Sequence, residues 1–529
     1  MSKEQLYIFD TTLRDGAQTQ GVDFSIDDKE KIASALDLLG VDYVEGGWPG
    51  ANPTDTEFFN KDHNFKSTKL TAFGMTKKSE HSAENDPMLS SLINSKSSSI
   101  CLFGKSWDFQ VEVALGISNE ENLTNISDST KHIVKSGKEF MFDAEHFFDG
   151  YRDSENFALK MLEAAVSGGA DTLVLCDTNG GSLPKSIYEV TAIVKKKFGN
   201  KVTIGIHAHN DCGLAVANTL MAVEAGARHV QGTINGVGER CGNASLSSII
   251  PNLILKMRKK SRTNLKLENL SSLVQFVYDV MNLQPDSQAP YIGKSAFAHK
   301  GGVHVSAVMK NSRMYEHINP RLVGNKQRVL VSDLSGKSNI NFKAKELNVD
   351  LKNHSDFSEI IVKKIKELEY QGYQYEVAEA SLELIFREIS GTFSPFFKIL
   401  DSNVQVTFDD NGIGKADARL KVLVDEEIEH TASDGLGPVD ALNKALMKAL
   451  IRFYPELDGV KLKDYKVRVL NEQAGTSAKV RVIIENTDGK SSWSTVGVSE
   501  NIIEASRQAI SDSLNYKLAT LNENQIKLN

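Results

Sequence analysis

The chain has 529 residues and a formal net charge of −8, with 40% hydrophobic and 25% charged residues, so its length suggests about three domains. This composition excludes a mainly disordered protein, and the mild acidity without a basic block argues against a nucleic-acid partner. No apolar run approaches the roughly 18 residues of a membrane span, and four cysteines without a CxxC pair predict a reduced, cytoplasmic protein.

The first half of the chain alternates short apolar strands with amphipathic helices eight times. The strands are nearly continuous in their hydrophobicity, as expected when both faces of a strand are buried. We expect strands at 7–9, 43–45, 70–73, 99–103, 140–142, 172–176, 203–206 and 229–233, and helices such as 27–39, 154–167, 184–197 and 214–225. Eight such units in about 250 residues predict an α/β fold, a closed (β/α)8 TIM barrel. An open doubly wound sheet is the alternative, but no GxGxxG motif follows the first strand.

Polar residues gather at the carboxyl ends of these strands, where the active sites of TIM barrels lie. His207 and His209 give the sharpest signal, because residues i and i+2 of a strand share one face and both imidazoles can point into the barrel mouth. Strand one lies beside strand eight in a closed barrel, so Asp15 and Asn243 can converge on the same point. These ligands suit Mn²⁺, Zn²⁺ or Co²⁺, with Mg²⁺ less natural because of the nitrogens. A merely hydrogen-bonded histidine pair is the alternative.

Arg14 stands directly before Asp15 and can stabilise negative charge that develops on a carbonyl oxygen. The structural alternative for Arg14 is an ion pair with Glu45 or Glu239.

The cysteines are expected to be structural. Cys176 lies in an apolar strand and should belong to the core. Cys212 and Cys241 are expected to be small packed residues near the site rather than ligands.

The segment that follows the barrel differs in composition. Helical patterns occur at 267–283, 355–369 and 376–389, and a region rich in Gly, Ser and Asn lies at 285–341. We expect an extension that packs on the barrel.

The tail carries an internal repeat with a period of 60 residues. Residues 421–425 match 481–485, and each copy continues with a glycine, an acidic helix start and an apolar helix. Two copies of strand–turn–strand–helix predict an α+β module that serves either dimerisation or regulation by a small molecule. We therefore expect a barrel domain at 1–265, helical linker subdomains that cover the active site at 266–400, and a regulatory domain at 401–529.

Three motifs together resemble a known family: the acyl-CoA-condensing TIM barrels, which are the isopropylmalate, homocitrate and citramalate synthases. They lie at 10–16, 207–211 and 238–243, and the tail is similar to that family's regulatory domain. Segments 103–109 and 144–150 look most like the citramalate synthase branch. The resemblance covers essentially the whole chain and implies a homodimer with active sites completed across subunits. It also implies that acetyl-CoA, pyruvate and water give citramalate and CoA in isoleucine biosynthesis, with isoleucine as feedback inhibitor.

Several alternatives to this activity stay open from the sequence. Isopropylmalate and homocitrate synthases use larger 2-oxo acids, and a related metal-dependent lyase or a non-catalytic amino-acid sensor would share the fold. Bulky residues could fill the space that a larger oxo acid needs, but the sequence does not show which of them point inward: Phe73, Met75, Leu102 and Phe142.

The resemblance assigns a metal site to the residues at the barrel mouth. It implies a divalent metal held by Asp15, His207 and His209, with Asn243 nearby, that binds and polarises pyruvate. It further implies that Arg14 contacts the substrate and stabilises the alkoxide.

The remaining assigned residues bind substrate or move protons. Glu145 resembles the family's essential active-site glutamate, and Thr178 its contact to the substrate carboxylate. His299 and Tyr315 resemble residues that enter the active site from the partner subunit. Isopropylmalate synthases usually have an acidic residue after this histidine, whereas this chain has Lys300. A lysine would lower the basicity of His299, so Glu145 or a water relay is an alternative base.

Overall fold

The computed structural model describes residues 5–347, 349, 356–408, 410–412, 414–470 and 478–528. The chain divides into two compact units. The first runs to Phe297 and includes Ile318–Lys326, and the second comprises Ala298–His317 and the chain from Gln327 onward. The three domains expected from the sequence, with boundaries at 265 and 400, stay a prediction.

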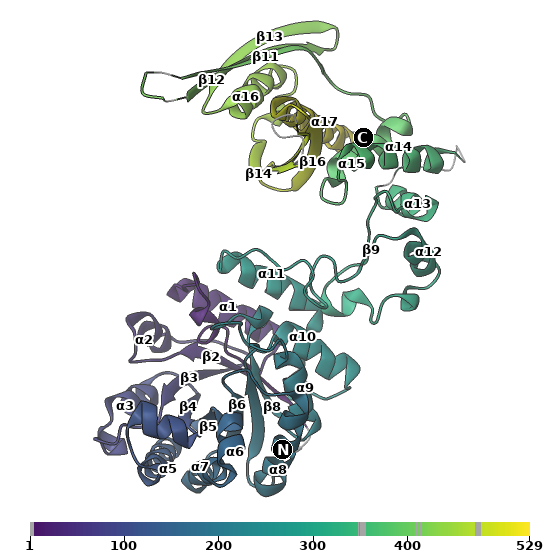
Figure 1. The fold of residues 1–529 in the computed structure, drawn as a ribbon. Helices are drawn as coiled ribbons and strands as arrows, with labels where there is room; N and C mark the ends of the chain where they lie inside the picture. The colour runs from purple at the N-terminus through teal and green to yellow at the C-terminus, as the bar shows by residue number, and fades with distance from the viewer. Residues whose placement is uncertain are drawn as a thin grey trace. The chain divides into compact units, whose positions relative to one another are not determined.

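The first unit is built on a closed barrel of parallel strands in sequential order, which confirms the predicted (β/α)8 fold (Figure 1). The first strand pairs with the second on one side and with the eighth on the other, which closes the ring. The strands are β1 Tyr7–Asp10, β2 Tyr43–Gly47, β3 Lys69–Met75, β4 Ser99–Lys105, β5 Glu139–Glu145, β6 Thr172–Asp177, β7 Thr203–Ala208 and β8 His229–Gly232. All eight lie where the sequence predicts them.

Helices connect successive strands around the barrel. They are α1 Ile26–Leu39, α2 Pro53–Asn60, α3 Pro87–Asn94, α4 Asp108–Gln110, α5 Asn119–Lys135, α6 Phe147–Asp153, α7 Glu155–Gly168, α8 Pro184–Phe198 and α9 Ala215–Glu224, and α10 Leu246–Pro251 follows the last strand. Local signals fix their ends. In α1, for example, Ser25 and Asp28 form a reciprocal capping box, and Gly40 ends the helix at a φ of 92°.

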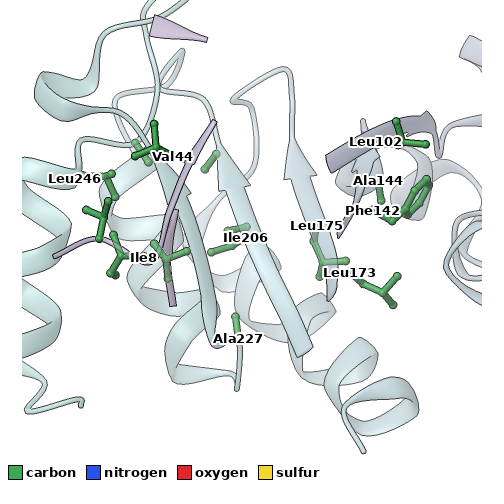
Figure 2. Packing of buried hydrophobic residues seen from close by; sticks show 14 of the residues in the cluster. Ile8, Val44, Leu102, Phe142, Ala144, Leu173, Leu175, Ile206, Ala227 and Leu246 are labelled. Carbon is green, nitrogen blue, oxygen red and sulfur yellow. The ribbon is translucent and has the colours of Figure 1, made fainter. Parts of the chain in front are cut away.

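Alternate residues of each strand face two different cores. One set packs outward with the helices, and Figure 2 shows Leu102 and Phe142 among these residues. The other set fills the barrel interior with Phe9, Tyr43, Phe73, Cys101 and Met141. This alternation matters for the site, because side chains at the inward positions of the strand ends reach the barrel mouth.

The segment after the barrel contains more regular structure than the sequence indicated. In the first unit, a short 3-10 helix at Leu267–Asn269 leads into α11 Leu270–Val280. The second unit contains β9 Ala298–His299, α12 Gly302–Lys310, β10 Arg328–Val329, α13 Lys337–Glu346, α14 Phe357–Gln371 and α15 Glu379–Ile389. The region rich in Gly, Ser and Asn therefore holds α12 and the first half of α13, two helices that were not predicted from the sequence. The expected helix at 355–369 is α14, and residue 355 lies outside the described residues.

The tail confirms the predicted repeat and adds a strand to each copy. Each copy is a three-stranded antiparallel sheet followed by a helix. The first copy has β11 Lys398–Phe408, β12 Gly414–Val424, β13 Glu427–Gly435 and α16 Pro438–Ile451, and the second has β14 Lys461–Val469, β15 Val480–Thr487, β16 Ser492–Ser499 and α17 Ile502–Leu528. In both copies the pairing of the first strand shifts register at an equivalent place. Both copies contribute to one hydrophobic core, which contains Val422, Leu446, Ile484 and Ile510.

None of the described helices is both long enough and apolar enough to cross a membrane.

Candidate metal centre and active site

Three of the four expected metal ligands meet at the carboxyl end of the barrel. His207 lies on β7, His209 follows it, and Asp15 lies in the loop after β1. His207 Nε2 lies 3.5 Å from Asp15 Oδ2 and 3.2 Å from His209 Nε2. All three side chains are buried, and their ligand atoms lie within 4.8 Å of one another. The structure thus brings these residues together, and their role as metal ligands stays a prediction.

The loop that carries Asp15 is tied to the loop after β8. The Thr12 hydroxyl donates to Asp10 Oδ2 at 2.8 Å and accepts from the backbone N–H of Ile234 at 2.9 Å. The Asp15 N–H donates to the backbone carbonyl of Thr11 at 2.9 Å. The bond between Ile234 and Thr12 joins the two loops, and the other two bonds fix the course of the loop that carries Asp15.

Asn243, the fourth expected ligand, is buried beside this set. Its backbone forms an isolated β-bridge with His209. Gly238 has a φ of 155°, and a Cβ at that position would lie 2.2 Å from Asn243 Nδ2. Only glycine leaves room for the Asn243 side chain at this place.

The polar atoms of the set fit a divalent ion. Asp15 Oδ1, Asn243 Oδ1 and His209 Nδ1 are buried and have no hydrogen-bond partner in the described part of the chain. Buried polar atoms normally have a partner, so such a cluster calls for a ligand. Carboxylate and amide oxygens with imidazole nitrogens are the donor set of Mn²⁺, Co²⁺ or Zn²⁺.

The charges in the set favour metal binding. Burial raises the pKa of Asp15, but the charge of Arg14 and the nearby His207 ring outweigh burial and hold this pKa well below its usual range. Burial also lowers the pKa of His207, while the carboxylate of Asp15 shifts it upward overall. Burial and the charge of His207 together lower the pKa of His209 to about 3. Asp15 is therefore ionised and His209 neutral, which are the forms that bind metals.

Arg14 is held rigidly next to this set. Its Nε donates to Glu45 Oε2 at 2.7 Å, and its Nη1 lies 3.1 Å from Asp15 Oδ2. The guanidinium also lies over the ring of Phe73, 3.9 Å from the ring centroid. The ion pair with Glu45 that the sequence suggested as an alternative is present, and the same contacts fix a cation at the barrel mouth.

Glu145 and Thr178 lie at the ends of neighbouring strands. Glu145 ends β5, and its Oε2 lies 2.5 Å from Lys105 Nζ at the end of β4. The Thr178 hydroxyl accepts from the backbone N–H of His146 at 2.8 Å, and its carbonyl accepts from Arg240 at 2.6 Å. The hydroxyl hydrogen of Thr178 is left to donate to an anionic group, as a contact with a carboxylate requires.

His299 belongs to the second unit, where an acidic residue contacts it after all. His299 Nε2 lies 3.3 Å from Oε1 of Glu316, and both side chains are buried. Lys300 Nζ instead pairs with Glu376 Oε1 at 2.5 Å, and this hydrogen bond raises the pKa of Lys300. The lysine that follows His299 in sequence thus has its own acidic partner. The role of His299 as a base stays a prediction.

Tyr315, the other residue predicted to act across subunits, stacks on a second histidine of this unit. The rings of Tyr315 and His304 lie 4.2 Å apart at an angle of 27°. Tyr315 is 46% exposed. Its ring is therefore positioned by the stack and remains accessible.

Sequence reasoning missed two residues behind the metal set and misjudged two cysteines. His207 Nδ1 lies 2.8 Å from Gln231 Oε1, and Gln231 Nε2 donates to Asp143 Oδ1 at 3.0 Å. A glutamine inside an apolar strand was the available signal. Cys176 is buried as expected. Cys212 and Cys241 were expected to be packed but are exposed, because the loops that carry them face solvent.

Comparison with known proteins adds three family matches along the chain. Residues 5–277 match the HMGL-like family. Residues 291–372 match the homocitrate synthase post-HMGL domain-like family, and residues 376–518 match the LeuA allosteric (dimerisation) domain.

Similar proteins align over nearly the whole chain. It is 52% identical to the (R)-citramalate synthase of Aquifex aeolicus, covering 97% of this chain and 98% of that protein. It is 48% identical to the (R)-citramalate synthase of Geobacter sulfurreducens, covering 97% of each. It is 33% identical to the 2-isopropylmalate synthase of Methanocaldococcus jannaschii, covering 98% of this chain and 95% of that protein.

Proposed function

The chain belongs to the HMGL-like family and to its group of (R)-citramalate and 2-isopropylmalate synthases, and from this premise we propose that it condenses acetyl-CoA with pyruvate and water to give (R)-citramalate and CoA. The observation that carries the proposal is the 52% identity over nearly full length with an (R)-citramalate synthase, against 33% with a 2-isopropylmalate synthase. The barrel fold and the polar residues gathered at its mouth support this proposal.

The electrophile in this reaction is the ketone of pyruvate. Asp15, His207 and His209, with Asn243 as a further oxygen ligand, would hold a divalent ion that polarises this ketone when bound. The nitrogens of the set favour Mn²⁺, Zn²⁺ or Co²⁺ over Mg²⁺. Arg14, fixed at the barrel mouth, stabilises the negative charge that develops on the ketone oxygen.

Substrate orientation and proton transfer fall to other residues. The Thr178 hydroxyl donates to the carboxylate of pyruvate. Glu145 contacts the substrates, and Glu145 or His299 removes a proton from the weakly acidic methyl group of acetyl-CoA. Glu316 supports the role of His299 because its carboxylate fixes the orientation of the imidazole. We assign His299 and Tyr315 to the active site of the partner subunit in a homodimer.

Aromatic side chains near Arg14 favour a small oxo acid. Phe73 and Phe103 stack at 5.4 Å, and Trp48 lies edge-on to both rings at 5.8 and 6.0 Å. Arg14 covers the Phe73 ring, so the three aromatic rings border the place where the oxo acid reacts. A methyl group needs little room beside such a wall, whereas the branched side chain of 2-oxoisovalerate needs more.

The tail supports an allosteric enzyme. Its match to the LeuA allosteric (dimerisation) domain agrees with a homodimer controlled by a small molecule. Isoleucine, the end product of the pathway that uses citramalate, is the effector we propose, and a cytoplasmic location fits this role.

The test of the activity is a panel of 2-oxo acids. Purified protein loaded with Mn²⁺ receives acetyl-CoA and one oxo acid at a time, and release of free thiol is followed. We expect kcat/KM to be highest for pyruvate, and isoleucine but not leucine to lower the rate. A kcat/KM for 2-oxoisovalerate above that for pyruvate would reassign the chain to the 2-isopropylmalate synthases. Cleavage of a 3-hydroxyacyl-CoA without condensation would point to a lyase.

A further inference from the structure

We propose that Asp143 and Gln231 form a buried relay that fixes the tautomer of His207 and thereby sets the metal affinity of the site. This proposal rests on the proposed metal centre and does not depend on which 2-oxo acid the enzyme uses. Its residues lie behind the ligand set, inside the barrel. They act through His207, so they are positioning residues.

The relay crosses three strands on the inner side of the barrel. Asp143 lies on β5, His207 on β7 and Gln231 on β8. Gln231 has no exposed surface, and the other two side chains are at most 5% exposed. A polar chain buried this completely costs free energy unless each group has a partner of the right kind.

The direction of the relay follows from donors and acceptors. Burial raises the pKa of Asp143 to about 6, so at pH 7 and above this carboxylate is mainly ionised and only accepts hydrogen bonds. The Gln231 group 3.0 Å from it is then the amide NH2. The amide oxygen of Gln231 then faces His207 Nδ1 at 2.8 Å and can only accept. His207 must therefore carry its proton on Nδ1, which leaves the lone pair of Nε2 directed toward Asp15 and His209.

A second histidine supports this orientation of the amide. His229 Nε2 lies 3.4 Å from Nε2 of Gln231. Burial lowers the pKa of His229 to about 3, and its ring packs against Phe9 and Tyr43. A neutral imidazole nitrogen can accept from the amide NH2, so both partners on this side of Gln231 are acceptors. A flipped amide would direct its oxygen at both of them and leave His207 Nδ1 facing a donor.

The relay has a specific consequence for the ligand set. Without Gln231, His207 can carry its proton on Nε2 instead and donate it to Asp15, 3.5 Å away. A metal ion would then have to displace that proton before it could bind. The relay removes this competing arrangement, and metal binds to a site that is already in the correct form.

The first test replaces the amide by an apolar group of similar shape, Gln231→Leu. Binding of Mn²⁺ alone is measured by electron paramagnetic resonance of the free ion, with no substrate present. We expect the dissociation constant for Mn²⁺ to rise about 10- to 100-fold, which is the usual effect of removing the hydrogen-bond partner of a metal-binding histidine. An affinity within twofold of the wild type overturns the proposal, and so does a wild-type chain that binds no Mn²⁺.

A matched control separates positioning from loss of any buried amide. Asn218 is also buried, and its amide donates to the Ser182 carbonyl at 2.8 Å and to Asp177 Oδ2 at 3.4 Å, neither of which belongs to the ligand set. Asn218→Leu is expected to lower the thermal stability of the metal-free protein as Gln231→Leu does, with Mn²⁺ affinity unchanged. Equal losses of affinity in both variants would assign the effect to general destabilisation and contradict the relay.

The decisive test exchanges the two ends of the relay. Asp143→Asn and Gln231→Glu are made singly and together, and the double variant keeps the net charge. In the double variant the carboxylate at position 231 accepts from His207 Nδ1–H, while its other oxygen accepts from the amide at position 143. Asp143→Asn alone lets the Gln231 amide flip, because an amide at position 143 can donate as well as accept, so we expect this variant to bind Mn²⁺ about tenfold more weakly. Gln231→Glu alone sets two buried carboxylates against each other, so we expect it to lower the stability of the metal-free protein. The double variant should recover both the affinity and the stability. A double variant no better than the weaker single one contradicts the relay, whichever 2-oxo acid the enzyme uses.

Discussion

At the scale of single residues, the site consists of charges that hold one another in place. Arg14 is fixed by carboxylates on two sides and by an aromatic ring below it, while Asp15 faces both Arg14 and the histidine pair. Each contact orients a group before substrate arrives. Rate enhancement from such fixed charges is typically the largest single contribution in an active site.

Arg14→Lys tests this fixed geometry because it keeps the charge. Lysine cannot reach Glu45 and Asp15 together or lie flat on the Phe73 ring. We expect kcat to fall about 10²- to 10³-fold, the usual loss when one donor to a developing oxyanion is removed. Steady-state kinetics with pyruvate and acetyl-CoA measure this, and Mn²⁺ affinity serves as the control. A kcat within threefold of the wild type would show that Arg14 does not stabilise the reacting oxygen.

Phe103→Ala tests the aromatic wall beside Arg14. Removal of this ring opens space next to Phe73, so the ratio of kcat/KM for 2-oxoisovalerate to that for pyruvate should rise about tenfold or more. Leu102→Ala is the matched control, because the neighbouring residue on the same strand faces the outer core. An unchanged ratio in Phe103→Ala, or an equal rise in the control, would place the specificity elsewhere.

Some residue-level features were readable in the sequence and others were not. The pattern at His207 and His209 was readable because a strand puts both side chains on one face, and Asp15 followed from closure of the barrel. The relay of Asp143 and Gln231 was not, since it depends on which residues of three separate strands meet inside the barrel. The contact between His299 and Glu316 was missed for the same reason, because it joins residues 17 positions apart.

At the scale of elements, burial decides which segments the sequence reveals. The eight barrel strands are buried on both faces, and their apolar runs stand out. β11 and β14 are edge strands of their sheets and are largely exposed, so they carry no such pattern. Helices α12 and α13 were obscured by the glycines and asparagines around them, whose effect on local propensity is outweighed by packing of residues such as Val305 and Ile340.

The packing of α17 against α15 predicts a pH-dependent stability. Burial raises the pKa of Asp512 to about 6, although the Ser381 hydroxyl donates to it at 2.7 Å. The unfolded chain has the ordinary value of 3.8. The folded state thus holds the proton more tightly, and this group lowers stability progressively as pH rises from about 4 to 6. Above pH 6 the loss is complete, at about 3 kcal/mol for a shift of roughly two units.

Asp512→Asn removes this loss. The variant should be more stable than the wild type, and its advantage should grow from about pH 4 to pH 6 and then stay nearly constant, as measured by hydrogen exchange of the α15 and α17 segments. Asp488 gives a control of opposite sign, since its hydrogen bond with Lys517 of the same helix holds its pKa below the usual range. Asp488→Asn should therefore lower stability at pH 8. An advantage of Asp512→Asn that does not change with pH would contradict the assignment.

At the scale of the whole molecule, the chain combines a catalytic barrel with a second unit, which contains the duplicated tail and two of the predicted active-site residues. The ligand set and Arg14 lie in the first unit, and His299 and Tyr315 in the second. Family resemblance alone suggested that these two sets meet across a dimer. The duplicated tail could be predicted from its period of 60 residues. The surface that it presents to a partner chain could not, because a sequence repeat does not identify which face meets another chain.

Subunit complementation tests whether active sites are completed across the dimer. His207→Ala and His299→Ala are each expected to be inactive, and His207→Ala should also lose Mn²⁺ binding while staying folded. After the two variants are unfolded and refolded together, half of the dimers are mixed, and one of two sites in each mixed dimer is intact. We expect about a quarter of wild-type activity. Activity no higher than that of the separate variants would place His299 in the site of its own chain.

Identification of the product tests the proposed reaction most directly. The protein is freed of metal, given Mn²⁺, and incubated with pyruvate and acetyl-CoA that carries ¹³C in the acetyl methyl group, and the mixture is followed by NMR. We expect the label in the methylene carbon of (R)-citramalate, one CoA released for each product molecule, and no product without metal. Absence of citramalate from the metal-loaded protein, or its formation in a metal-free sample, would contradict the proposed reaction.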